Sequence, residues 1–430
     1  MERKAMNQLY AWKEKSRRKP LIIRGARQVG KTWLMKEFGA RAYEKVVYIN
    51  FDRNQAMSDL FSKDLDVARL IKGLELYSGV QIDSSNTLLI FDEIQEVPNA
   101  LASLKYFYEN TPEYHIVSAG SLLGVALHQG TSFPVGKVEF MELYPLTFSE
   151  YLSAIGKDRY AKLLEEKDYS LITSFKGEFM DDLRQYFYVG GMPEVVSHFL
   201  ENQDYNEARE IQREILMAYE QDFSKHAPVE IVPRIRMLWN SIPTQLSKEN
   251  KKFIYGLVKE GARAKEYEMA LLWLCDCGLV HKIHRVNQGH IPLKSYEDSK
   301  AFKLFLLDVG LMSCMVNLKP SILLEGDALF VEFKGSLTEQ YVLQSLKANQ
   351  IYGIYYWSND RNTNELDFLL DGGDVIVPLE VKSAENLQSK SLKAFVEKYG
   401  IKKAVRISMA DYRIQDWMVN LPLYGVDDYF

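Results

Sequence analysis

The residues with the clearest chemistry are Gly25 to Thr32, which read Gly-Ala-Arg-Gln-Val-Gly-Lys-Thr. They fit the pattern G-x-x-x-x-G-K-[ST], in which backbone N–H groups of a glycine-rich loop surround phosphate oxygens. The apolar run at 20–23 predicts a buried strand before the loop, and the spacing at 33–38 predicts a helix after it. A strand, a loop and a helix in this order direct the positive end of the helix dipole at an anion. We therefore expect this segment to bind the phosphates of ATP.

Two residues of this loop have distinct expected tasks. Lys31 is expected to reach the β- and γ-phosphate oxygens, and the Thr32 hydroxyl is expected to ligate Mg²⁺. The alternative is a glycine turn beside a surface lysine, which leaves both the apolar strand and the Lys-Thr pair unexplained. The residues expected to contact the nucleotide in this segment are Gly25, Gln28, Val29, Gly30, Lys31, Thr32 and Trp33.

A second run, at 87–93, predicts a buried strand that ends in two carboxylates, Asp92 and Glu93. Parallel sheets bind ligands at the carboxyl ends of their strands, so both acids are expected beside the phosphate loop. Asp92 would then ligate Mg²⁺ together with Thr32, and Glu93 would orient and polarise the attacking water. A solvated acidic pair at a strand end is the other interpretation. The pattern predicts an ATP hydrolase with ATP and Mg²⁺ as its cofactors.

A third constellation lies near the C-terminus and consists of Asp367, Glu380 and Lys382. On a strand, Glu380 and Lys382 are two residues apart and share a face, and a Gly-Gly turn at 372–373 brings Asp367 towards them. Two carboxylates can bind Mg²⁺, and a lysine can stabilise the negative charge that develops on a phosphodiester. The alternative is a half-exposed hairpin with ordinary surface charges. Because Asp367 interrupts an apolar run, we favour a metal-dependent catalytic site.

The elements that must position the first site alternate between strands and helices. Further strands are expected at 46–50, 114–118 and 138–143, which together predict an α/β fold with a doubly wound parallel sheet. Ser118 and Ser121 follow the fourth strand and are expected beside the strand of Asp92. Their hydroxyls either read the γ-phosphate or form a turn. Ser121 is retained as a nucleotide-binding residue.

The remainder of the chain divides into three predicted regions. The pattern is helical from about 150 to 230, where the break at Gly190-Gly191-Met192-Pro193 is either a connector or a turn that presses Pro193 against adenine. A helix and a basic strand within 231–325 suggest a winged helix. Lys282 and Arg285 are its candidate phosphate contacts. Glu266 and Glu268 on the preceding helix would repel a duplex, which favours the alternative of a protein-packing unit. The expected domains are an ATPase core at 1–155, a helical lid at 156–230, a winged helix-like domain at 231–325 and a C-terminal domain at 326–430.

Composition limits the classes of protein that remain. The chain has 430 residues, a net charge of -5 and three cysteines, which favours several globular domains without a disulfide framework. It holds no long apolar run and no apolar leader near Met1, so we expect a cytoplasmic protein that does not enter membranes. An acidic chain has no general attraction to nucleic acid, so any such contact requires a local basic patch.

The motifs in combination resemble prokaryotic AAA+ ATPases fused to a C-terminal domain of unknown function. The matching segments are 25–32, 91–95, 132–137, 188–194 and 305–311. The resemblance implies an ATPase core, a helical lid, a winged helix and a C-terminal fold similar to restriction endonucleases. It also implies that Gly191-Met192-Pro193 contacts the nucleotide, and that Glu339, on a helix expected at 336–343 with Ser336 as its cap, joins the nuclease motif. Some relatives have arginine where Lys137 stands, so no arginine finger is assigned.

Two functions remain open. The first is an Mg²⁺-dependent AAA+ ATPase that acts on DNA or another nucleic acid through a nuclease-like C-terminal domain. The second is an ATP-controlled switch in signalling or defence, whose C-terminal domain binds without cleaving. A homo-oligomer is compatible with both, and a membrane partner is not expected.

Overall fold

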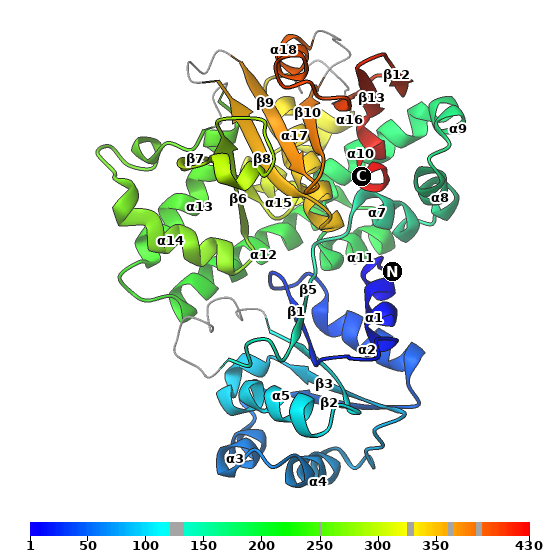
Figure 1. Ribbon diagram of the computed structural model, residues 1–430, viewed down its shortest axis with the longest axis vertical. Coiled ribbons are helices and arrows are strands. Elements are labelled where there is room, and N and C mark those ends of the chain that lie inside the picture. Colours follow the sequence, from blue (N-terminus) through cyan, green and yellow to red (C-terminus); the bar gives the residue numbers. More distant parts are fainter. Residues whose placement is uncertain (121–132, 249–251, 325–330, 360–363, 384–388) are drawn as a thin grey trace. The chain divides into compact units, whose positions relative to one another are not determined.

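The computed structural model describes residues 1–120, 133–248, 252–324, 331–359, 364–383 and 389–430. The chain forms two compact units (Figure 1). The smaller unit comprises Glu2–Tyr144 and Asp276–Gly278, and the larger one comprises Met1, Pro145–Cys275 and Leu279–Phe430.

The smaller unit is built on a five-stranded parallel sheet with the strand order β2-β3-β4-β1-β5. The predicted parallel α/β sheet is thereby confirmed, and every strand lies within one or two residues of its expected position. Helices cover both faces, because alternate residues of each buried strand point to opposite sides of the sheet. The strands are β1 (Leu21–Arg24), β2 (Lys45–Asn50), β3 (Thr87–Asp92), β4 (His115–Ala119) and β5 (Glu139–Glu142), and the helices are α1 (Ala5–Lys13), α2 (Lys31–Ala42), α3 (Gln55–Lys63), α4 (Val67–Ser78) and α5 (Pro98–Asn110).

The larger unit begins with a helical region. Its N-terminal part contains six helices in succession, as the periodicity of 150–230 predicts. Two more helices lead into the strands of this unit. In chain order the eight are α7 (Phe148–Ala154), α8 (Asp158–Glu166), α9 (Tyr169–Ser174), α10 (Lys176–Val189), α11 (Pro193–Asn202), α12 (Tyr205–His226), α13 (Val232–Leu246) and α14 (Ala264–Asp276).

The second part of the larger unit is an eight-stranded mixed sheet with the order β12-β13-β11-β10-β9-β8-β6-β7. Helices α17 and α18 both contact β10 (Figure 1). Helix α18 supplies Leu392, Phe395 and Val396 to a hydrophobic core with strand residues. The strands are β6 (Val280–Val286), β7 (Glu297–Leu306), β8 (Gly353–Ser358), β9 (Glu365–Asp371), β10 (Ile376–Val381), β11 (Ala404–Ser408), β12 (Arg413–Ile414) and β13 (Met418–Pro422), and the helices are α15 (Val309–Met315), α16 (Pro320–Leu324), α17 (Val331–Asn349), α18 (Lys390–Tyr399) and α19 (Val426–Tyr429).

The hairpin expected to form the wing, β6 and β7, is present but belongs to this large sheet. Strand β6 pairs antiparallel with β7 and parallel with β8, so one sheet continues across the predicted boundary at 325/326. This pairing covers a strand edge of β8 that would otherwise present unpaired backbone groups. The winged helix is therefore not confirmed. The expected cap Ser336 was wrong as well, because α17 begins at Val331 and the Ser336 hydroxyl donates to the Leu246 carbonyl.

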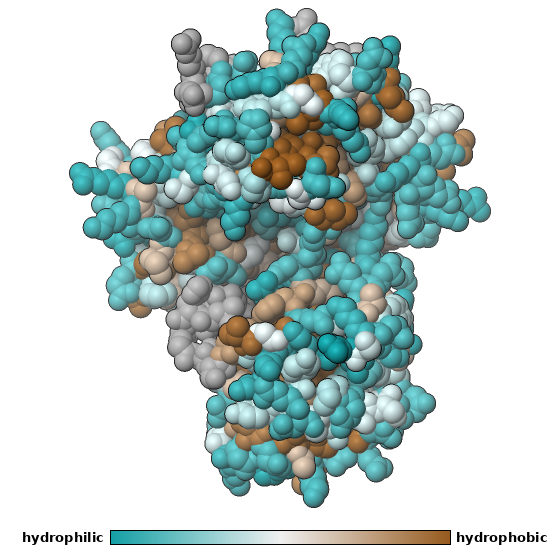
Figure 2. Space-filling model, in the orientation of Figure 1, coloured by the Kyte–Doolittle hydropathy of each residue, from teal (hydrophilic) through white to brown (hydrophobic). Residues whose placement is uncertain are grey.

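The surface is mainly hydrophilic on the visible face, and an apolar patch lies over strands of the large sheet (Figure 2). Within the described ranges, no helix combines the length and the apolar character needed to cross a bilayer.

Candidate nucleotide site and a second carboxylate cluster

The phosphate loop connects β1 to α2, as the sequence predicts. Gly25 and Gly30 have φ angles of 145° and 94°, in the region that L side chains rarely adopt. A Cβ atom at Gly25 would also overlap the carbonyl oxygen of Leu143. Helix α2 begins at Lys31, so the loop lies at a helix N-terminus, where free N–H groups and the helix dipole attract anions. The loop therefore has the geometry of a phosphate cradle.

Lys31 is held inside this loop. Its side chain is only 7% exposed, and its Nζ donates to the carbonyl oxygens of Gly25 at 2.9 Å and Ala26 at 2.7 Å. Burial lowers the pKa of Lys31 to about 8, while the nearby Glu93 and Asp92 carboxylates act in the opposite direction. A triphosphate would supply the anionic partner that a buried ammonium needs.

Asp92 ends β3 and meets Thr32 at the start of α2. The Thr32 Oγ1 donates to Asp92 Oδ2 at 2.6 Å, and the Tyr48 hydroxyl of β2 donates to the same oxygen at 3.0 Å. The other carboxylate oxygen accepts the backbone N–H of Glu93 at 3.1 Å. A hydroxyl and a carboxylate side by side are the oxygen donors that Mg²⁺ prefers, so Thr32 and Asp92 fit this ion. Tyr48 was not foreseen, although β2 lies next to β3 in the sheet.

Glu93 follows Asp92 in a left-handed conformation with φ of 51°. Gln95 Nε2 donates to Glu93 Oε2 at 2.7 Å. A carboxylate oriented by an amide can polarise a water molecule. Gln95 is a second residue that the motif alone did not indicate.

Ser118 lies on β4, the strand between the one that precedes the phosphate loop and the one that carries Asp92. Its neighbours in the sheet are Ile22 on β1 and Phe91 on β3. The Ser118 hydroxyl is buried and has no hydrogen-bond partner among the described residues. Ser121 lies outside the described residues, so its expected contact with the nucleotide stays a prediction.

The Gly190-Gly191-Met192-Pro193 turn joins α10 to α11 in the larger unit. Gly191 donates its backbone N–H to Asp308 Oδ2 at 2.7 Å and accepts from the Leu146 N–H at 2.7 Å. A Cβ atom at Gly191 would overlap the Leu146 carbonyl, so the close backbone approach by itself requires glycine. Contact of Pro193 with adenine stays a prediction.

Asp367, Glu380 and Lys382 come together in the larger unit. Leu379 pairs with Phe368 in the β9–β10 ladder, so Glu380 and Asp367 occupy neighbouring positions of adjacent strands. Asp367 Oδ2 accepts the Val381 N–H at 2.7 Å, and Lys382 Nζ lies 2.9 Å from Glu380 Oε1. The buried Glu380 Oε2 has no hydrogen-bond partner among the described residues.

A buried lysine that sequence reasoning missed lies in the same cluster. Lys303 on β7 is fully buried, with its Nζ 2.5 Å from Glu365 Oε1 and 3.9 Å from Glu339 Oε2. Burial by itself would lower the pKa of Lys303, but the carboxylates of Glu365, Glu339 and Asp367 raise it above its ordinary value. Two signals were available: Lys303 interrupts an apolar run, as Asp367 does, and Glu365 is two residues before Asp367 on one strand.

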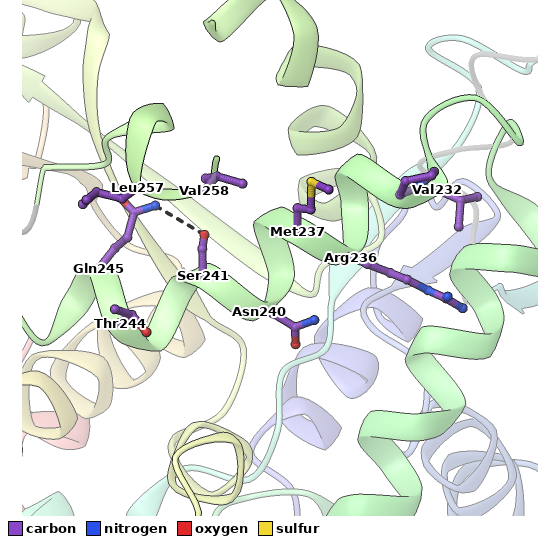
Figure 3. A pocket seen from close by; sticks show the side chains of 10 residues that line it. Val232, Arg236, Met237, Asn240, Ser241, Thr244, Gln245, Leu257 and Val258 are labelled. Carbon is purple, nitrogen blue, oxygen red and sulfur yellow. Dashed lines mark hydrogen bonds between the residues drawn. The ribbon is translucent and has the colours of Figure 1, made fainter. Parts of the chain in front are cut away.

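Two further features bear on ligands of the larger unit. The expected phosphate contacts of the hairpin have partners within the protein: Arg285 Nη2 lies 2.6 Å from Asp298 Oδ2, and Lys282 Nζ lies 4.4 Å from the centroid of the Phe302 ring. A cavity of about 620 Å³ runs along α13 and is bordered by Leu257 and Val258 (Figure 3). Arg236 is the one ionisable side chain among its described lining residues, so the cavity shows no catalytic constellation.

Comparison with protein families divides the chain into three segments. Residues 17–152 match the AAA domain, residues 180–322 match a domain of unknown function (DUF8612), and residues 334–424 match another domain of unknown function (DUF4143). The first match covers the phosphate loop, Asp92 and Glu93. The chain therefore contains an AAA-type P-loop ATPase domain, followed by two segments whose families have no assigned function.

The solved structures that match this chain include the following three. The Walker-type ATPase of Pyrococcus abyssi is 15% identical, with 73% of this chain and 95% of that chain covered and a TM-score of 0.47. Orc1 of Aeropyrum pernix in complex with DNA is 12% identical, with 73% and 90% covered and a TM-score of 0.26. AMPPCP-bound DnaA from Aquifex aeolicus is 18% identical, with 62% and 73% covered and a TM-score of 0.25. A comparison with curated proteins finds no match.

Proposed function

We propose that the protein binds ATP with Mg²⁺ at the phosphate loop and hydrolyses it. The contact that carries this proposal is the 2.6 Å hydrogen bond between Thr32 and Asp92, because it joins two Mg²⁺ donors at the mouth of the loop. Lys31 would hold the β- and γ-phosphate oxygens. Mg²⁺ would neutralise charge that develops on the phosphates, and Glu93 would orient the attacking water.

Hydrolysis is tested with Glu93→Gln. The amide keeps the shape of the side chain but polarises water poorly, so ATP binding should persist while turnover falls on the order of a hundredfold. Glu96→Gln is the matched control, because Glu96 is exposed and lies only three residues further on. Steady-state ATP hydrolysis and calorimetric ATP binding are measured on all three proteins. Hydrolysis by Glu93→Gln at the wild-type rate would refute the role of Glu93.

We further propose that the C-terminal segment is a nuclease-like domain that acts on nucleic acid. Support comes from the adjacent positions of Asp367 and Glu380 and from the Glu380 oxygen without a described hydrogen-bond partner, which suits a cation ligand. Lys382 would stabilise the negative charge of a phosphodiester during cleavage. We also propose that residues 326–430 have a restriction endonuclease-like fold and that residues 156–230 form a helical lid.

The second candidate is a switch whose C-terminal domain binds a partner without cleaving it. Two observations favour it: Lys382 is already paired with Glu380, and no group of three or more His, Cys, Asp or Glu side chains in the described part of the chain could hold a metal ion. Single- and double-stranded DNA incubated with Mg²⁺, with and without ATP, separates the candidates. Cleavage that Asp367→Asn abolishes and the exposed Asp374→Asn retains supports the nuclease. ATP hydrolysis without DNA cleavage supports the switch.

A further inference from the structure

The buried Lys303 has no role in the functions proposed above. It lies on β7 within an apolar stretch, and its ammonium is 0% exposed. Its Nζ is 2.5 Å from a Glu365 oxygen, 3.9 Å from a Glu339 oxygen and 4.8 Å from the centroid of the Tyr356 ring. Burying an ammonium costs several kcal/mol unless carboxylates compensate its charge. The burial of Lys303 therefore depends on the carboxylates around it.

The charges of this cluster fall into two groups. Lys303 pairs with Glu365 of β9 and approaches Glu339 of α17. On the other side, Glu380 of β10 pairs with Lys382, whose side chain is 37% exposed. The first lysine lies on the edge strand β7 with its side chain fully buried, whereas the second lies near the surface and can move. The Glu339–Glu365 side thus has a permanent cation, and the Asp367–Glu380 side has an exchangeable one.

We propose that the Lys303 ammonium takes the place of a second divalent cation, so that this cluster binds one Mg²⁺ or Mn²⁺ at most, at Asp367 and Glu380. The expected number of bound ions depends on the metal site proposed above at Asp367 and Glu380. The role of Lys303 as a counter-ion for Glu339 and Glu365 does not depend on that site. Two-metal sites hold ions about 3.5–4 Å apart and share carboxylates between them. A divalent ion at Glu339 and Glu365 would repel the ammonium that already lies against them.

This arrangement also joins two parts of the chain. Lys303 precedes the C-terminal family segment at 334–424, whereas Glu339 and Glu365 lie within it. The segment from about residue 326 onwards therefore lacks its internal cation when it is expressed alone. Experiments on this site consequently require the full chain.

The test counts bound Mn²⁺ by calorimetric titration of the full chain without nucleotide. All proteins carry Asp92→Asn, which removes the Mg²⁺ ligand of the other unit. Lys303→Met removes the internal cation, and Lys303→Met with Glu365→Gln removes one carboxylate as well. Lys300→Met is the control, because Lys300 is exposed on the same strand. The thermal unfolding of each metal-free protein is measured in parallel.

We expect one Mn²⁺ per chain in the background protein and in Lys300→Met, and two in Lys303→Met. The metal-free Lys303→Met protein should unfold roughly 10 °C lower, because the partly buried Glu365 and the buried Glu339 lose the cation between them. Added Mn²⁺ or the Glu365→Gln change should restore its unfolding temperature. Wild-type stoichiometry together with wild-type stability in Lys303→Met would overturn the proposal, as would two Mn²⁺ ions bound in the background protein.

The background protein also separates this proposal from the proposed metal site. If it binds no Mn²⁺, the metal site at Asp367 and Glu380 is refuted. In that case, the role of Lys303 is supported if Lys303→Met binds one Mn²⁺ ion and the double variant with Glu365→Gln does not. The role of Lys303 is overturned if Lys303→Met binds no ion.

Discussion

Replacing Lys31 with methionine should stabilise the smaller unit while abolishing its binding of ATP. Burial lowers the pKa of Lys31 from 10.5 to about 8, which corresponds to about 3 kcal/mol of unfavourable free energy for the charged form at pH 7. Methionine removes this charge with little change in volume. It also removes the hydrogen bonds to the Gly25 and Ala26 carbonyls, at a cost of about 1 kcal/mol each. The net expectation at pH 7 is a gain in unfolding free energy of about 1 kcal/mol.

The difference in unfolding free energy between the wild type and Lys31→Met should change with pH. Below pH 8 both the folded and the unfolded chain keep the proton on Lys31, so the unfavourable free energy is fully present. Between pH 8 and 10.5 the folded state releases the proton while the unfolded state retains it, so wild-type stability rises relative to the variant, by about 3 kcal/mol in total. The two stability curves should therefore cross, with the methionine variant more stable at pH 7 and the wild type more stable near pH 10.5.

Urea unfolding without nucleotide, followed by circular dichroism from pH 7 to pH 10.5, measures both curves. Calorimetric titration with ATP and Mg²⁺ at pH 7 measures binding. Lys63→Met is the control, because Lys63 is exposed on α3 of the same unit. Parallel curves for the wild type and Lys31→Met, or a variant that is less stable at pH 7, would refute the reasoning from burial.

Three further predictions follow from the same geometry. Tyr48→Phe should raise the Mg²⁺ concentration for half-maximal ATP hydrolysis about tenfold, because Asp92 loses a hydrogen bond that orients its carboxylate. ATP affinity, measured calorimetrically, should fall by up to about tenfold per pH unit above pH 8, because Lys31 loses the charge that holds the phosphates. Gly191→Ala should lower the unfolding free energy of the larger unit by about 1–3 kcal/mol in urea titrations, because its Cβ atom would overlap the Leu146 carbonyl.

Matched variants control for these effects. Tyr106→Phe removes an exposed phenol in the smaller unit and should leave the Mg²⁺ dependence unchanged. Gly177→Ala adds a Cβ atom with no neighbour within 4 Å in α10 and should stabilise the larger unit slightly. The first prediction is contradicted if Tyr48→Phe and the wild type have the same Mg²⁺ dependence. The second is contradicted if ATP affinity does not change with pH, and the third if Gly191→Ala has the unfolding free energy of the wild type.

Local patterns were sufficient to predict the smaller unit. Alternation of apolar runs with helical spacing located all five of its strands, and the loop at 25–32 lies between a strand and a helix as expected. These features depend on neighbours in the chain: strand burial, glycine φ angles and the start of a helix. The positions of Asp92 and Glu93 at the end of β3 followed from the same rules.

Contacts that join distant segments could not be read in this way. The hairpin of β6 and β7 looks local, but its place in the large sheet depends on the pairing of β6 with β8, more than 60 residues further on (Figure 1). Tyr48 reaches Asp92 only because β2 and β3 are neighbours in the sheet.

Local sequence patterns therefore predicted the candidate residues for a triphosphate and Mg²⁺, because those residues lie close together along the chain or follow a recognisable strand. Tertiary structure alone decided that Lys303 lies against Glu339 and Glu365. A buried charge needs a partner in space, and the chain brings that partner from another element.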